Sequence, residues 1–125
     1  MNANLTIQMA AISGFLAVAF GAFGAHGLKD KLSSDMLAVY RTAVEYQFYH
    51  TMALLLVGIL IQQAGKTTAL TISANAFIFG IAVFSGSLYI LSISGVRWLG
   101  AITPIGGVAF LIGWLALAYA SYRMS

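Results

Sequence analysis

The chain has 125 residues, of which 61% are hydrophobic and only 7% are charged. Soluble domains contain roughly 45–50% apolar and 25% charged residues, so this composition excludes an ordinary soluble fold. The net charge of +3 comes from six scattered cations, which argues against a nucleic-acid-binding protein. The absence of cysteine excludes disulfides, thiol nucleophiles, and zinc–thiolate or iron–sulfur sites.

Four long stretches of the chain carry no charged residue. A helix needs roughly 20 apolar residues to cross the ~30 Å hydrocarbon core of a bilayer. The four stretches contain 28, 20, 30 and 25 residues, at 1–28, 46–65, 67–96 and 98–122. They predict an all-α integral membrane protein, with a single four-helix domain over residues 1–125.

The first helix is expected over residues 5–25. Its N-terminal side has no basic segment, and its apolar stretch is longer than the 7–15 residues typical of a signal peptide, so we expect the helix to be retained. Gly14, Gly21 and Ala25 lie on a stripe of small residues, which is typical of close helix packing in membranes.

The second helix is expected over residues 34–63, with Ser33 or Ser34 as its N-cap. Thirty helical residues would extend about 45 Å, which is more than the membrane requires. We therefore expect residues 35–45 to form an interfacial helical segment, and residues 46–61 to cross the membrane.

The third and fourth helices follow short turns, over residues 68–93 and 98–122. The start of the fourth helix has two interpretations. Thr103 could cap a helix that begins at Pro104, the first-turn position where proline is favoured, or a kinked helix could begin at Trp98. Because all the turns are short, neighbouring helices must run antiparallel, which predicts an up-down-up-down bundle.

Antiparallel packing places most of the unusual polar residues at the end that carries the first and third loops. Polar groups at membrane depth usually face a bundle interior or water, so we predict a shallow polar vestibule there. Its candidate residues are His26, Arg41, Glu45, Gln47, His50, Ser85, Ser87, Tyr89, Arg97 and Thr103. The candidate helix-packing residues are Gly14, Gly21, Ala25, Gly80, Gly106 and Gly113.

Glu45 allows two interpretations. It could form an interfacial ion pair with Arg41, four residues earlier on the same helical face, or it could be a titrating carboxylate in a half-buried cavity. Glu45 and His50 differ by about 140° around a helix, which weakens any catalytic pair between them. Haem ligation by His26 and His50 is disfavoured by their different depths, so we expect no cofactor, no metal and no catalytic residue.

Four sequence blocks together resemble one known family: Gly21-Ala-Phe-Gly-Ala-His26, Glu45-Tyr-Gln-Phe-Tyr-His50, Phe84-Ser-Gly-Ser-Leu-Tyr89, and Thr103-Pro-Ile-Gly-Gly107 with Gly113-Trp114. The family is domain of unknown function 423, which is similar also to the eukaryotic transmembrane protein 256. The resemblance covers essentially the whole chain. It implies a small, multi-pass protein of the bacterial inner membrane and supplies no activity or functional residues.

Three functions remain open at this stage. The favoured one is a non-enzymatic membrane protein that binds lipid or a partner membrane protein, or that assembles as a homo-oligomer, because the chain has several small-residue stripes and few catalytic groups. The alternative is a small oligomeric transporter or channel that uses Glu45 or His50 for proton coupling. An intramembrane enzyme is the least favoured. The positive-inside rule favours cytoplasmic first and third loops.

Overall fold

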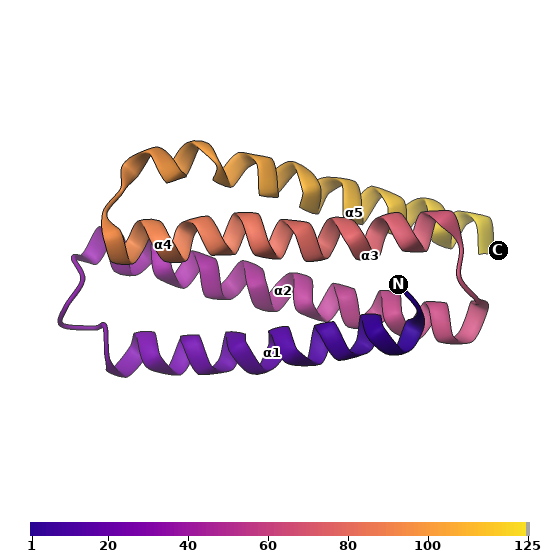
Figure 1. The fold of residues 1–125 in the computed structure, drawn as a ribbon, viewed down its shortest axis with the longest axis horizontal. Helices are drawn as coiled ribbons and strands as arrows, with labels where there is room; N and C mark the ends of the chain where they lie inside the picture. The colour runs from indigo at the N-terminus through magenta and orange to yellow at the C-terminus, as the bar shows by residue number, and fades with distance from the viewer. Residues whose placement is uncertain (125) are drawn as a thin grey trace.

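The computed structural model describes residues 1–124, which form four long helical spans joined by short turns (Figure 1). All four spans are long and apolar enough to cross a membrane. Both termini lie at the end of the bundle that carries the α2–α3 turn, and the other two connections lie at the opposite end. The elements are α1 (Ala3–His26), α2 (Ser34–Ala64), α3 (Thr68–Gly80), the π-helical turn η1 (Ile81–Ser85), α4 (Gly86–Ser94), the 3₁₀ turn η2 (Arg97–Ala101) and α5 (Thr103–Met124).

The helix starts follow ordinary capping chemistry. The side chains of Asn2, Ser33 and Thr67 each accept a hydrogen bond from a backbone N–H in the first turn of α1, α2 and α3, respectively. These bonds satisfy donors that have no partner within the helix. After α2 and α4 the chain turns at Gly65 and Gly95, whose φ angles of 91° and 73° favour glycine.

The helix bounds differ from the expected ones mainly in two places. The third span, expected as one helix over 68–93, contains the π-helical turn Ile81–Ser85. The start of the fourth span combines both interpretations, because a 3₁₀ turn over Arg97–Ala101 precedes an α-helix that begins at Thr103. The second span is one unbroken helix from Ser34 to Ala64, close to the expected 34–63, and the interfacial position of its first part stays a prediction.

The spans are arranged as a series in which α2 packs on α1 on one side and on the α3–η1–α4 span on the other. In turn, α5 packs mainly on α3 and η1. The larger core cluster is centred on Leu54, Val57, Leu70 and Phe77. A smaller cluster around Ala43 and the leucines of α4 lies toward the end that carries the first and third loops. Consequently α1 is the least buried of the four spans.

Close contact between α5 and the third span depends on glycine. A Cβ atom at Gly113 would lie 2.6 Å from Cδ1 of Phe77, and one at Gly106 would lie 2.7 Å from Cβ of Phe84. Gly80 faces the ring of Phe110 in the same way. Among the other expected packing residues, Gly14 and Gly21 lie against α2 with more room, whereas Ala25 is exposed.

Candidate functional site

Gln47 is the centre of a buried hydrogen-bond network that joins three spans. Its side chain is only 4% exposed. Its Nε2 donates to the backbone carbonyl of Ser13 on α1 at 3.0 Å, and its Oε1 accepts from the hydroxyl of Tyr89 on α4 at 2.6 Å. One amide on α2 thus holds α1 and α4 at the same time.

The network continues through two hydroxyl groups between α1 and α2. Ser13 Oγ and Thr51 Oγ1 lie 2.7 Å apart, and Gln47 Nε2 is 3.3 Å from Ser13 Oγ. Within the part of the chain that the structure describes, no buried side-chain nitrogen or oxygen lacks a hydrogen-bond partner. A buried polar group without a partner is costly, so this arrangement is compatible with a dry bundle interior.

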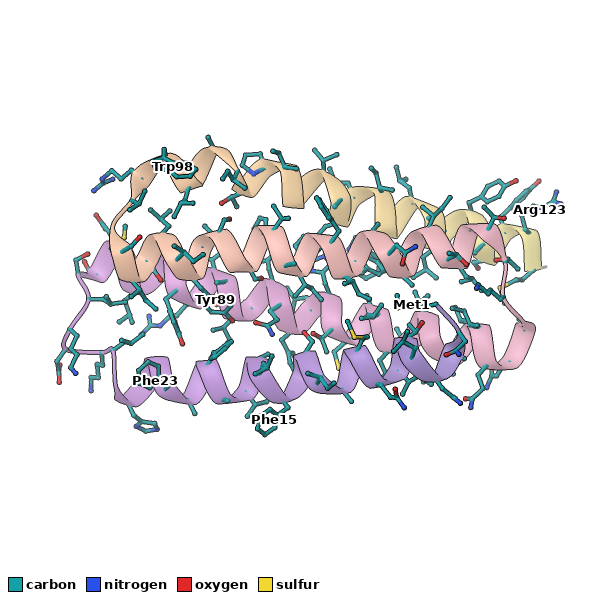
Figure 2. The ribbon with its side chains drawn as sticks, viewed as in Figure 1. Met1, Phe15, Phe23, Tyr89, Trp98 and Arg123 are labelled. Carbon is teal, nitrogen blue, oxygen red and sulfur yellow. The ribbon has the colours of Figure 1, made fainter. Side chains whose placement is uncertain are left out.

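Tyr89 lies between α4 and α1 among aromatic rings (Figure 2). Its ring meets those of Phe20 and Tyr40 edge-on, at centroid distances of 5.1 and 5.3 Å. The Tyr40 hydroxyl donates to the Phe20 carbonyl at 2.6 Å. These contacts hold the Tyr89 hydroxyl toward Gln47, because edge-to-face aromatic pairs have a preferred geometry.

Two serines near the π-helical turn connect the third span to its neighbours. Ser85 Oγ donates to the backbone carbonyl of Ala43 on α2 at 2.8 Å. Ser87 Oγ lies 2.6 Å from Thr103 Oγ1 at the start of α5, and Thr103 Oγ1 also donates to the Leu99 carbonyl at 3.3 Å. All three hydroxyls are buried and occupied by bonds between or within helices.

His50 forms a second polar contact, between α2 and α5. The indole Nε1–H of Trp114 donates to His50 Nε2 at 3.0 Å, and His50 Nδ1 lies 2.8 Å from the Tyr46 carbonyl. Since indole only donates and a carbonyl only accepts, the imidazole must be neutral, with its proton on Nδ1. The ring also stacks on Phe110 at a centroid distance of 3.5 Å.

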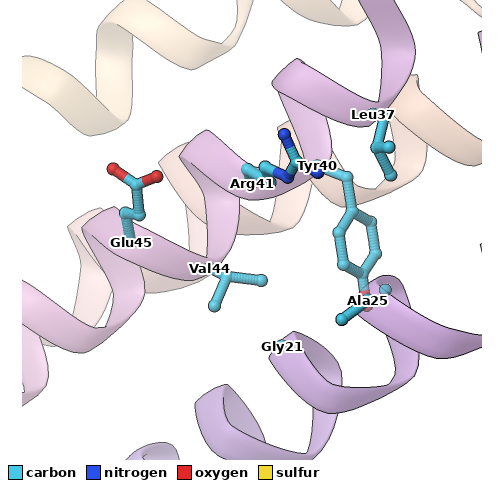
Figure 3. A pocket seen from close by; sticks show the side chains of 8 residues that line it. Gly21, Ala25, Leu37, Tyr40, Arg41, Val44 and Glu45 are labelled. Atoms are coloured by element: carbon cyan, nitrogen blue, oxygen red, sulfur yellow. The ribbon is translucent and has the colours of Figure 1, made fainter. Parts of the chain in front are cut away.

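The remaining expected vestibule residues lie on the outside. His26, Arg41, Glu45 and Arg97 are exposed. The Glu45 carboxylate accepts from the Tyr49 hydroxyl at 3.3 Å. It forms no ion pair with Arg41, whose guanidinium is directed away from it (Figure 3).

The predicted vestibule residues therefore occupy two separate environments. Gln47, His50, Ser85, Ser87 and Thr103 are buried and Tyr89 is half-buried, whereas the charged residues and His26 are exposed. Glu45 lines a notch beside α1, whereas His50 contacts Phe110 and Trp114 of α5, as the angular separation of the two residues on the helix predicts. Both ring nitrogens of His50 are engaged by protein groups, so ligation of a haem iron would require breaking one of these bonds.

Two hollows lie between α1 and the third span, and we call them together the lateral groove. Its first part is a cavity of about 220 Å³. Its second part, about 190 Å³, lies beside Tyr89. The first part is lined by Met9, Ile12, Ser13 and Leu16 of α1, by Gln47 and Leu54 of α2, and by Ile78, Ile81 and Ala82; the second by Phe20, Phe23, Tyr40, Tyr89 and Ile93.

Sequence reasoning missed three residues of these networks: Ser13, Thr51 and Trp114. Ser13 and Thr51 were unremarked polar residues in the middle of their spans. Thr51 follows Gln47 by one helical turn, and this spacing on one face was the available signal. Trp114 is 44% exposed, yet its indole N–H reaches inward to His50, because a tryptophan inside an apolar span still needs a hydrogen-bond acceptor.

Comparisons with known proteins agree with the membrane assignment. A family model described as "Protein of unknown function (DUF423)" matches residues 20–107. The "UPF0382 membrane protein" of Staphylococcus epidermidis is 46% identical over 121 residues, which cover 95% of this chain and 96% of the relative. "UPF0382 membrane protein YwdK" of Bacillus subtilis is 44% identical over 117 residues, covering 94% and 95% of the two chains.

A third relative has a similar identity and coverage. The "UPF0382 membrane protein" of Haemophilus influenzae is 43% identical over 120 residues, which cover 96% of this chain and 95% of the relative. No solved structure matches the chain significantly. The family match confirms the resemblance inferred from the four sequence blocks. This four-helix membrane protein belongs to the DUF423 family, whose matched relatives are UPF0382 membrane proteins.

Proposed function

We propose that this protein is a non-enzymatic membrane protein that holds a hydrocarbon chain of a membrane lipid in its lateral groove. The main support is the state of the polar groups that line the groove. Ser13, Gln47 and Tyr89 hydrogen-bond one another or the backbone. The surface left for a ligand is therefore chiefly apolar, which suits an acyl chain better than a polar substrate.

The size and position of the groove support the same occupant. Pockets that enclose a whole drug-sized ligand measure about 300–1,000 Å³, whereas the first part of the groove measures about 220 Å³. Met9 and Ile12 on its α1 wall are 38% and 58% exposed. A groove of this size, open along its side, fits a segment of a lipid chain that enters from the bilayer.

A non-enzymatic role is further supported by the engagement of the reactive side chains. His50 uses both ring nitrogens in bonds to Tyr46 and Trp114. The Ser85 hydroxyl donates to a backbone carbonyl. These groups contribute to helix contacts in their present geometry. We place the protein in the bacterial inner (plasma) membrane, because the matched relatives are bacterial membrane proteins and the chain crosses as helices.

The proposal is tested with a phospholipid that carries a photoactivatable group on its acyl chain. The purified protein is reconstituted with this lipid, irradiated, and digested for peptide mapping by mass spectrometry. We expect adducts concentrated on residues 9–16 of α1 and residues 78–82 of the third span. Adducts spread evenly over all exposed apolar faces, including Val108 and Leu111 of α5, would contradict the proposal.

A matched pair of variants gives the first prediction. Ala82→Phe places a ring in the groove and is expected to reduce adduct formation at α1 several-fold, because the ring takes the space of the acyl chain. Ala118→Phe adds the same ring on an exposed position of α5 outside the groove, and should leave labelling of α1 unchanged. In native mass spectrometry, Ala82→Phe should retain less lipid than Ala118→Phe.

A further inference from the structure

The helix α2 carries two heptad-like seams on opposite sides. The buried seam runs through Tyr40, Ala43, Gln47, Leu54, Val57 and Ile61. The second seam has the same alternating spacing of three and four residues, and all of its members are exposed: Ala38, Arg41, Glu45, Phe48 and Met52. We call this second set the outward seam. A spacing of 3.5 residues is the pattern by which two helices pack side by side.

The outward seam contains two opposite charges near the hydrocarbon region. A Cβ at Gly21 would lie 3.3 Å from Val44 Cγ1, so Glu45 is about level with Gly21. That position is five residues before the end of α1, or about 8 Å along the helix. A charged side chain at such a depth usually pairs with another charge or faces a water-filled interior.

Neither charge is satisfied as an ion pair within its own chain. Among residues 1–124, Arg41 forms no ion pair or hydrogen bond through its side chain, and Glu45 has only the Tyr49 hydroxyl. The neighbouring face of α1 does not cover them, because Gly21, Gly24 and Ala25 line the adjacent notch of about 120 Å³ (Figure 3). Both charges are accessible from outside.

We propose that two copies of this chain pair in parallel through the outward seam. Copies inserted in the same orientation are related by a twofold axis along the membrane normal, so each seam residue lies at the same depth in both copies. Arg41 and Glu45 are separated by about 6 Å along the helix, a distance that an extended arginine side chain covers. Arg41 of each copy then pairs with Glu45 of the other, while Phe48 and Met52 pack below them.

The surface is complementary to itself, which favours a second copy over an unrelated partner. The twofold symmetry gives two equivalent ion pairs, each between Arg41 of one copy and Glu45 of the other, so positive and negative charges alternate around the axis. Partial desolvation strengthens such pairs relative to exposed ones. The pairing is independent of the lateral groove, which opens between α1 and the third span, so a failure of one proposal leaves the other standing.

Disulfide crosslinking tests the pairing directly, because the natural chain has no cysteine. Phe48→Cys and Met52→Cys, each as a single variant in liposomes, are expected to crosslink into a species of twice the 13.2 kDa chain mass. The controls are Phe15→Cys on α1 and Leu111→Cys on α5, at residues that are 72% and 64% exposed. Crosslinking at the seam should persist at low protein-to-lipid ratio. Equal crosslinking at all four positions, or none at the seam, would overturn the proposal.

Charge reversal tests the role of Arg41 and Glu45 in the Phe48→Cys background. Arg41→Glu and Glu45→Arg, each alone, place like charges together and should reduce crosslinking several-fold. The double variant Arg41→Glu with Glu45→Arg restores opposite pairs and should recover most of the crosslinking. Circular dichroism checks that each variant remains helical. If folded single variants crosslink as well as the parent, or if the folded double variant does not recover, the reciprocal pairing is wrong.

Discussion

At the residue scale, the buried polar side chains of this protein connect helices to one another. Gln47 illustrates the principle, because its amide both donates and accepts and thus joins α1 to α4 through α2. In a bilayer the apolar surfaces of helices gain little from meeting each other, since the lipid is equally apolar. Packing and interhelical hydrogen bonds therefore determine which helical faces meet.

The bond from Tyr89 to Gln47 gives a prediction about stability. Tyr89→Phe removes the hydroxyl donor and should lower the free energy of unfolding by about 0.6–1.7 kcal/mol, the range of interhelical hydrogen bonds in membranes. Unfolding in mixed detergent micelles measures the change. Tyr119→Phe, at an exposed position on α5, should change stability by less than about 0.5 kcal/mol.

A double-mutant cycle separates the bond from other effects of the two side chains. Gln47→Leu should cost more than Tyr89→Phe, because it also removes the donor that serves the carbonyl and the hydroxyl of Ser13. If Tyr89 acts through Gln47, the double variant should cost less than the sum of the single variants. Strict additivity would show that the two side chains contribute independently.

At the element scale, the π-helical turn Ile81–Ser85 is the main irregularity of the fold. It includes Phe84, whose backbone is in close contact with Gly106 of α5. A π-helical turn adds a residue to the helical turn and changes the phase of the residues after it. Ser85 and Ser87 consequently meet α2 and α5 with their hydroxyls.

This contact predicts opposite results for two glycines near the turn. Gly106→Ala forces a methyl group onto the backbone of Phe84, and should destabilise the protein by about 1–3 kcal/mol, the usual cost of overpacking. A Cβ at Gly86 would meet no atom within 4 Å. Gly86→Ala should therefore be neutral, or stabilising by up to about 1 kcal/mol, through helix propensity. The free energies of unfolding of both variants in the same micelles check this difference, and equal changes in stability would contradict it.

At the scale of the whole molecule, the four spans form a series in which α1 lies at one end and packs mainly on α2. This series leaves the lateral groove on one side of α1 and the outward seam along α2. The two proposals thus use different surfaces, one for a lipid chain and one for a second copy.

The arrangement also predicts which parts of the chain share a side of the membrane. Single cysteines at Asp30 and Ser94 should react with an impermeant maleimide added on one side of the membrane, and single cysteines at Gln63 and Met124 with maleimide added on the other. The reason is that the first and third connections lie at one end of the four spans, and the α2–α3 turn and the C-terminus lie at the other end. The excess of Lys and Arg favours the cytoplasm for the first pair. Labelling of Asp30→Cys and Ser94→Cys from opposite sides would contradict the topology.

The charge-free stretches were enough to predict that the chain lies in a membrane, that it has four spans, and that neighbouring spans run antiparallel. The reason is that a chain in hydrocarbon must satisfy its own backbone groups, which makes each long apolar stretch a helix. Local capping signals at Ser33 and Thr67, and the glycines after α2 and α4, then set most helix ends to within a few residues.

The meeting of particular side chains could not be derived in this way. Glu45 and Gln47 are two residues apart, yet the first lies outside and the second lies in the centre of a three-helix network. Their environments depend on the rotation of α2 about its axis, which is set by packing against partners distant in sequence. The π-helical turn has the same origin, since the approach of α5 to Phe84 is a long-range contact. Each helix forms because its own residues lie in the bilayer, whereas its rotation about its axis is set by packing against the other helices of the bundle.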